Sequence, residues 1–145
     1  MGRKEFKYQT ITKCIALLYV LLFTYAATSK LLDMERFIGQ LGRFPYISDY
    51  AKALAWGVPT AELLVVVLYL FPKYTLAALY ASLWLMVAFT IYIALVLRFS
   101  NHVPCACGGV LSQLGWTEHL VFNLVFVLFA VLGIYLKNQQ QYKCI

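Results

Sequence analysis

Two cysteines in a polar stretch of an otherwise apolar chain are the residues best suited to chemistry. Cys105 and Cys107 are separated by one alanine, follow Pro104 and precede two glycines. Two residues of extended chain place the Cα atoms about 7 Å apart, at the upper edge of the ~4.4–6.8 Å that a disulfide tolerates. The segment must therefore turn for the thiols to join, and a bridge there is strained. Strained, exposed bridges are typically labile or catalytic, so the pair indicates thiol–disulfide exchange.

Two other interpretations of the same residues stay open. The cysteines are also small apolar residues that pack without any chemistry. Together with His102 and His119 they form a set of four metal ligands, although their spacing is shorter than that of ordinary zinc sites. We expect Cys105 and Cys107 to be catalytic without a bound metal, with His102 or His119 assisting deprotonation and the N-terminal end of the next helix favouring the thiolate.

The composition is that of a membrane protein. The chain has 145 residues, of which 63% are hydrophobic and 12% charged, and its mean hydropathy is +0.76. These values lie far outside the range of ordinary soluble domains and leave room for about four spans of ~20 residues. The net charge of +6 comes from basic residues that flank apolar runs, where they contact lipid head groups. We expect contact with membrane lipid and no binding of nucleic acid.

The apolar runs predict an all-α membrane protein, a bundle of four transmembrane helices in one domain of residues 1–145. The spans cover approximately residues 12–32, 51–71, 75–98 and 117–136. The first run is interpreted as a retained span, since no clean cleavage site follows it. The connection of only Pro72, Lys73 and Tyr74 makes the second and third spans antiparallel neighbours.

A short helix is expected between spans 1 and 2. Met34, Phe37, Ile38 and Leu41 recur at helical spacing, after Asp33 as N-cap and before Gly42. The helix either lies in the membrane interface or packs over the bundle as an ordinary loop helix.

Glu62 is the acidic residue of the second apolar run. A carboxylate inside a span is costly, normally faces the bundle interior, and is a candidate for a functional site. The alternative is a structural role that bridges two helices, with Lys30 as its partner.

The basic residues predict the orientation. With a cytoplasmic N-terminus, seven lie inside and five outside, which agrees with the preference for positive cytoplasmic loops. Both termini are then cytoplasmic, and Cys105 and Cys107 face the periplasm of a bacterium, where disulfides persist. Cys14 and Cys144 lie across the bilayer and cannot resolve a Cys105–Cys107 bridge directly. The inner set is Arg3, Lys4, Lys7, Lys13, Lys73, Lys137 and Lys143; the outer set is Lys30, Arg36, Arg43, Lys52 and Arg98.

Three segments in this order resemble the MauE/DoxX-like family of small four-helix membrane proteins. Residues 28–33 read Thr-Ser-Lys-Leu-Leu-Asp and are followed by Phe37; residues 59–63 read Pro-x-x-Glu-Leu; residues 103–109 read Val-Pro-Cys-Ala-Cys-x-Gly. The last segment is similar to the signature of the MauE branch. Gly108 stands where that branch has phenylalanine, so no packing role of that aromatic ring carries over.

The resemblance implies a redox-associated protein of the bacterial inner membrane. MauE-type proteins are linked to disulfide formation in the maturation of periplasmic methylamine dehydrogenase, and DoxX-type proteins to quinone-coupled oxidation of sulfur compounds. For this chain it implies a thiol–disulfide oxidoreductase that acts on a periplasmic thioredoxin-like or thiol-containing partner. Glu62 and Lys30 would line the site of a quinone head group. The alternative is a non-catalytic membrane anchor or assembly subunit that binds other membrane subunits. No methylamine substrate follows from the sequence.

Overall fold

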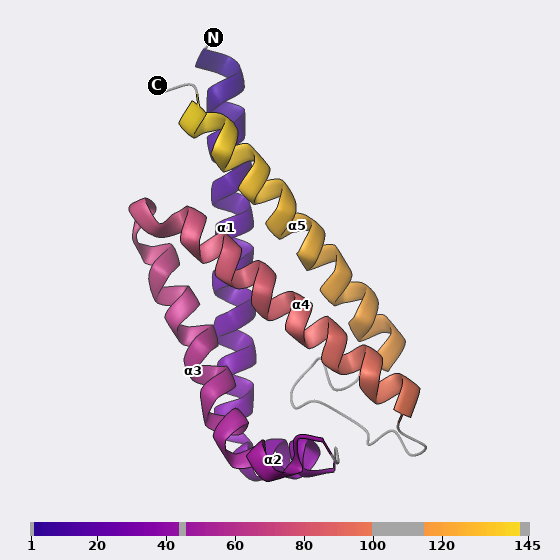
Figure 1. Cartoon of the computed structure of the whole chain (residues 1–145). Helices are drawn as coiled ribbons and strands as arrows, with labels where there is room; N and C mark the ends of the chain where they lie inside the picture. The colour runs from indigo at the N-terminus through magenta and orange to yellow at the C-terminus, as the bar shows by residue number, and fades with distance from the viewer. Residues whose placement is uncertain (1, 44–45, 100–114, 143–145) are drawn as a thin grey trace.

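The structure is a computed structural model that describes residues 2–43, 46–99 and 115–142. Within these ranges every regular element is a helix. Four long helices, α1 (Gly2–Leu32), α3 (Ala51–Leu70), α4 (Thr75–Phe99) and α5 (Trp116–Tyr142), are each long and apolar enough to cross a membrane. The prediction of an all-α protein with four transmembrane helices is confirmed (Figure 1).

Two helices extend beyond the predicted spans. α1 already begins at Gly2, and α5 continues to Tyr142. Neither extension contains a proline, and in the first of them the Thr10 hydroxyl donates to the carbonyl of Phe6 within the helix. Hydropathy locates the part of a helix that suits lipid, whereas the helix itself continues until something interrupts it.

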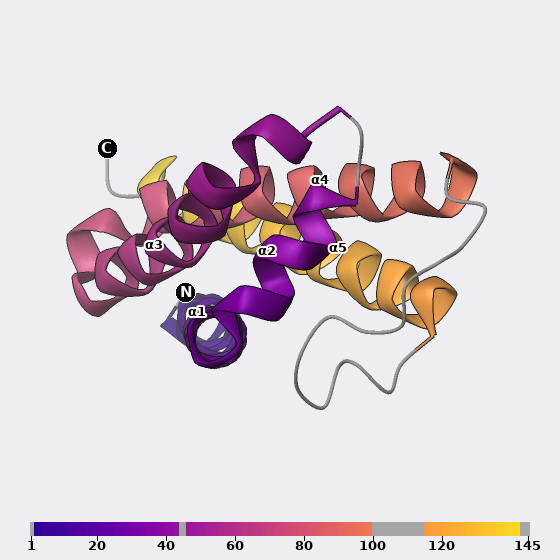
Figure 2. The same ribbon diagram turned by 90° about the horizontal axis from the view of Figure 1, so that it is seen from below.

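The predicted short helix is α2 (Met34–Gly42), which starts after Asp33. Its apolar side packs on the beginning of α3, because Leu41 forms a buried cluster with Ala51 and Ala55. A 3₁₀ turn, η1 (Ser48–Tyr50), leads directly into α3. Seen along the bundle, α2 lies across its end (Figure 2).

The long helices pack in two closely associated pairs, α1 with α3 and α4 with α5. α3 and α4 are joined by the short turn η2 (Pro72–Tyr74) and contact each other, as predicted for antiparallel neighbours. The N-terminal end of α1 and the C-terminal end of α5 lie at one end of the bundle, and α2 lies at the other (Figure 1). The last turn of α4 and the first turn of α5 are also at the α2 end.

The centre of the bundle is filled by aromatic and small side chains. Tyr19 and Phe23 are almost completely buried, and their rings stack with centroids 5.5 Å apart. The Tyr19 hydroxyl donates to the backbone carbonyl of Phe126 on α5. Tyr69 of α3 and Ser82 of α4 join their hydroxyls at 2.8 Å, so the polar atoms of this core are paired between helices.

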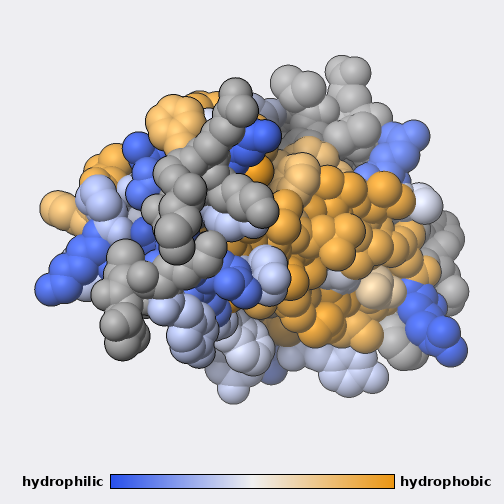
Figure 3. Space-filling view, turned by 90° about the horizontal axis from the view of Figure 1, so that it is seen from above, coloured by the Kyte–Doolittle hydropathy of each residue, from blue (hydrophilic) through white to orange (hydrophobic). Residues whose placement is uncertain are grey.

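Large apolar side chains also cover the outside of the bundle. The exposed fractions of three leucines on different helices are 59% for Leu17, 61% for Leu64 and 67% for Leu128. A wide hydrophobic surface lies between hydrophilic residues at either side of the molecule (Figure 3). Helices that are apolar on all sides are typical of membrane spans, so this surface contacts lipid.

Candidate functional site

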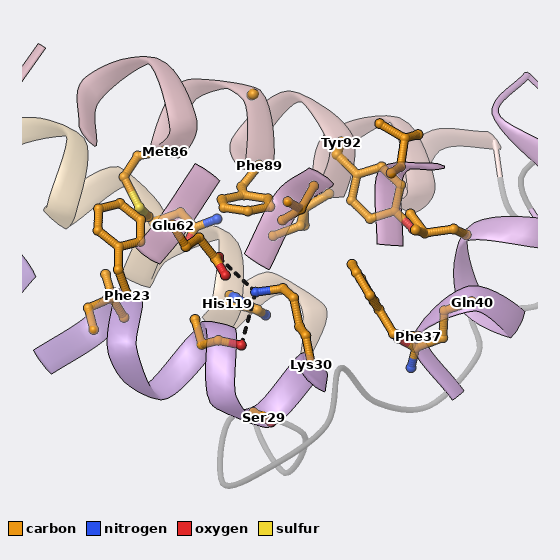
Figure 4. Close-up of a pocket in the computed structure, with 18 of the residues that line it drawn as sticks. Phe23, Ser29, Lys30, Phe37, Gln40, Glu62, Met86, Phe89, Tyr92 and His119 are labelled. Atoms are coloured by element: carbon orange, nitrogen blue, oxygen red, sulfur yellow. Dashed lines mark hydrogen bonds and ion pairs between the residues drawn. The ribbon is translucent and has the colours of Figure 1, made fainter. Parts of the chain in front are cut away.

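A cavity of about 320 Å³ opens at the α2 end of the bundle and is lined by residues of all five α-helices. Most of its wall is apolar, but Lys30, Glu62, His119 and Asn123 also line it. Figure 4 shows the side chains of Lys30, Glu62 and His119 close to one another between the helices. An apolar cavity with a few convergent polar groups is the usual form of a small-molecule site.

Lys30 and Glu62 form a buried ion pair inside this cavity. Lys30 lies near the end of α1 and Glu62 in the middle of α3, and the packing of these two helices brings Nζ within 2.8 Å of Oε1. Nζ also donates to the carbonyl of Ala26 at 3.3 Å. None of the Glu62 side chain is exposed, against 20% of that of Lys30. A charged partner stabilises a buried carboxylate, and Lys30 is the partner that the structural interpretation of Glu62 predicted.

Two aromatic rings flank the ammonium group. The Lys30 Nζ lies 5.3 Å from the ring centroid of Phe89 on α4 and 5.9 Å from that of Phe37 on α2. Both distances are within the range of cation–π attraction. Both rings also line the cavity, so they form flat apolar parts of its wall next to the Lys30 ammonium.

Two buried polar atoms of the cavity wall have no hydrogen-bond partner among the described residues. They are Glu62 Oε2 and Asn123 Nδ2. Asn123 is 3% exposed and lies one helical turn after His119 on α5. Most buried polar atoms in proteins are hydrogen-bonded, so these two atoms are candidates for contacts with a ligand in the cavity.

His119 lines the cavity. It is half-buried, and its ring meets that of Phe122 edge-on with centroids 6.5 Å apart. His102, Cys105 and Cys107 lie outside the described residues, so their catalytic role remains a prediction. Within residues 2–43, 46–99 and 115–142, no three His, Cys, Asp or Glu residues are grouped as metal ligands.

Sequence reasoning missed three residues of this site. Asn123 stands four residues after His119, and that spacing places two side chains on the same face of a helix. Phe37 was noted only for its helical spacing and its place in the family segment, and Phe89 was not singled out as a site residue. Their position over Lys30 depends on how α2 and α4 lie against α1, which no spacing within one helix reveals.

The comparisons with known proteins fit this architecture. No curated protein and no solved structure matches the chain. The family model described as methylamine utilisation protein MauE matches residues 8–136. That range includes all of α3 and α4, most of α1 and α5, and every residue of the cavity named above. The chain therefore belongs to the MauE family and is a multi-pass membrane protein.

Proposed function

We propose that this protein is a thiol–disulfide oxidoreductase of the bacterial inner membrane, which oxidises a periplasmic thiol partner and passes the electrons to a quinone. The observation that carries the proposal is the cavity with its charged pair, at the end of the bundle where the cysteine segment is attached. Residues 100–114 connect α4 to α5, and the cavity wall includes Ile93 in the C-terminal third of α4 and His119 in the first turn of α5. Catalytic roles for Cys105, Cys107 and His102 come from the sequence.

The proposed reaction has two steps. A thiolate of the partner attacks the Cys105–Cys107 disulfide and forms a mixed disulfide, which the second partner thiol resolves, so the partner becomes oxidised and Cys105 and Cys107 become thiols. The quinone then accepts two electrons and two protons from these thiols. The disulfide is restored and the quinone becomes a hydroquinone.

The cavity suits the head group of a quinone. A volume of about 320 Å³ lies at the lower end of the range for ligand sites, ~300–1,000 Å³, and accommodates one substituted ring. Phe37 and Phe89 offer flat surfaces to such a ring. Lys30 and Asn123 offer hydrogen-bond donors to its oxygens, while the apolar tail of the quinone would remain among the lipids.

The remaining polar residues have complementary roles in this proposal. Glu62 holds Lys30 in place through the ion pair of 2.8 Å. His119 lines the cavity and lies four residues after Gly115, where the described part of the chain resumes after the cysteine segment. There it is suited to exchange a proton between the cysteine thiols and the quinone.

The test measures whether a quinone oxidises the cysteine pair. The protein is purified in a background in which Cys14 and Cys144 are replaced by serine, reduced, exposed to decylubiquinone, denatured and treated with a maleimide of known mass. We expect the loss of two maleimide adducts per chain within the assay. The matched control carries Cys105→Ser and Cys107→Ser in the same background and should show no adducts with or without quinone.

The alternative, a non-catalytic assembly subunit, gives the opposite results. In that case the two adducts persist at every quinone concentration. The Cys105→Ser, Cys107→Ser variant would also retain the protein's function in cells, whereas an oxidoreductase loses it.

A further inference from the structure

We infer that the cavity binds the hydroxyl-bearing form of its aromatic ligand, a hydroquinone or phenol, more tightly than the carbonyl form. This inference rests on the proposed function, because it specifies which redox state of the electron carrier the site prefers. It is carried by two atoms in the cavity wall that have no hydrogen-bond partner in the part of the chain that the structure describes, Glu62 Oε2 and Asn123 Nδ2.

Glu62 Oε2 requires a hydrogen-bond donor from the ligand. The other oxygen of this carboxylate accepts a hydrogen bond of 2.8 Å from the Lys30 ammonium, a charge-assisted contact that stabilises the ionised form of the carboxylate. An ionised carboxylate only accepts hydrogen bonds. None of the described residues donates a hydrogen bond to Oε2.

Asn123 Nδ2 requires an acceptor. Its side chain comes from α5 and that of Glu62 from α3, and both line the same cavity. A ligand that satisfies both atoms must therefore bring a donor and an acceptor into a mostly apolar space.

The two redox states of a quinone differ in this respect. Each hydroxyl of a hydroquinone both donates and accepts, so the reduced form satisfies both atoms. A quinone carbonyl only accepts, which satisfies Asn123 and leaves Glu62 Oε2 facing another lone pair. Since unsatisfied buried groups are costly and bonds to charged groups are strong, we expect the hydroxyl form to bind at least about ten-fold more tightly.

Such a preference has a direct redox consequence. For a two-electron couple, a ten-fold tighter hold on the reduced form raises the potential of the bound quinone by about 30 mV. The cavity would thus favour electron flow from the thiols to the quinone and retain the hydroquinone after the reaction.

The preference is tested with two probes that do not exchange electrons in the assay. 4-Heptylphenol and its methyl ether, 4-heptylanisole, differ in the hydroxyl hydrogen that Glu62 would accept, which the ether replaces with a methyl group. Binding of each to the purified protein in detergent is measured by isothermal titration calorimetry. We expect the phenol to bind at least about ten-fold more tightly; equal affinities, or no binding of the phenol, would overturn the inference.

Two variants identify the groups responsible. In Glu62→Gln, the amide oxygen faces Lys30 and the amide nitrogen faces the cavity, so the acceptor becomes a donor and the preference for the phenol should disappear or reverse. Glu35→Gln is the matched control, because Glu35 is exposed on α2 and does not line the cavity, and it should keep the wild-type ratio. Asn123→Leu should weaken the binding of both probes, and the phenol should still bind more tightly than its methyl ether.

The probe experiment does not depend on the cysteines. It is repeated in the Cys105→Ser, Cys107→Ser variant, where the preference should be unchanged. A retained preference together with maleimide adducts that resist quinone would refute the proposed function and leave the ligand assignment intact. Equal probe affinities in a protein whose cysteines are oxidised by quinone would refute the assignment alone.

Discussion

The ammonium of Lys30 on α1 lies 2.8 Å from the carboxylate of Glu62 on α3, and this contact fixes two neighbouring helices at the wall of the cavity. Lys30→Met would leave the carboxylate buried without a counter-charge, so we expect the free energy of unfolding to fall by about 3–5 kcal/mol. The double variant Lys30→Met, Glu62→Leu removes both charges and should be markedly more stable than the single variant. Thermal unfolding in detergent measures both.

The control for this pair is the ion pair of Arg36 and Asp33. Its charged atoms are 3.7 Å apart, and both side chains are about half exposed. Arg36→Met should lower stability by less than about 1 kcal/mol. A Lys30→Met variant as stable as Arg36→Met would show that Glu62 is not buried with its charge.

The hydroxyl pair of Tyr69 and Ser82 predicts an asymmetry. Ser82 Oγ donates its single hydrogen to the carbonyl of Ala78 at 2.8 Å, so Tyr69 must be the donor in the contact between the two hydroxyls. Ser82→Ala leaves the buried Tyr69 hydroxyl without an acceptor and should lower the free energy of unfolding by about 1–3 kcal/mol. Tyr69→Phe leaves Ser82 bonded to Ala78 and should lower it by only about 0.5–1.5 kcal/mol. Chemical unfolding of both variants gives the difference. Thr90→Ala, which removes only a bond within α4, should cost less than Ser82→Ala.

Gly133 on α5 allows a close approach to α4. A Cβ atom at this position would lie 2.9 Å from Cδ2 of Leu79, which is itself fully buried. Gly133→Ala should therefore lower the melting temperature, at a cost of about 1–3 kcal/mol for overpacking. Gly57 has open space at its Cβ position, and Gly57→Ala should instead stabilise α3 by about 0.5–1 kcal/mol. The same sign of change in both variants would contradict this packing.

Occupying the cavity with protein atoms should block the quinone. Ala26 lines the cavity, and Ala26→Leu adds three carbons there without changing a polar group. We expect quinone-dependent oxidation of the cysteines to slow by ten-fold or more, equivalent to about 1.4 kcal/mol, as followed by the maleimide assay. Ala53→Leu is the control, because Ala53 is exposed on α3 and is not part of the wall. Equal rates in the two variants would argue against the cavity as the quinone site.

The proposed orientation is tested at two exposed tyrosines. Tyr46 follows α2 and is 82% exposed; Tyr142 ends α5 and is 78% exposed. In a background without native cysteines, Tyr46→Cys should react with a membrane-impermeant maleimide in spheroplasts. Tyr142→Cys should react only after the membrane is permeabilised. The reverse pattern would place the cysteine segment in the cytoplasm.

The sequence was sufficient for the four spans and for α2, because both depend on patterns within one segment of chain. The lipid-facing runs are long and apolar, and the apolar residues of α2 recur at helical spacing between Asp33 and Gly42. The predicted spans are shorter than α1 and α5, since hydropathy does not detect a polar helical extension.

The site was predictable only in part. Glu62 was found because an acidic residue in a span is costly, and Lys30 followed as the basic residue at the end of the preceding span. Asn123 carries no charge and gives no comparable signal in the sequence. Its importance appears only when α3 and α5 line one cavity and its amide is seen to lack a partner.

Because every α-helix contributes wall residues to this one cavity, no shorter fragment of the chain would retain it. A truncated protein that omits even the nine residues of α2 would lose Phe37 and open the charged end of the cavity to its surroundings. The smallest unit that retains ligand binding should therefore run without interruption from α1 through α5.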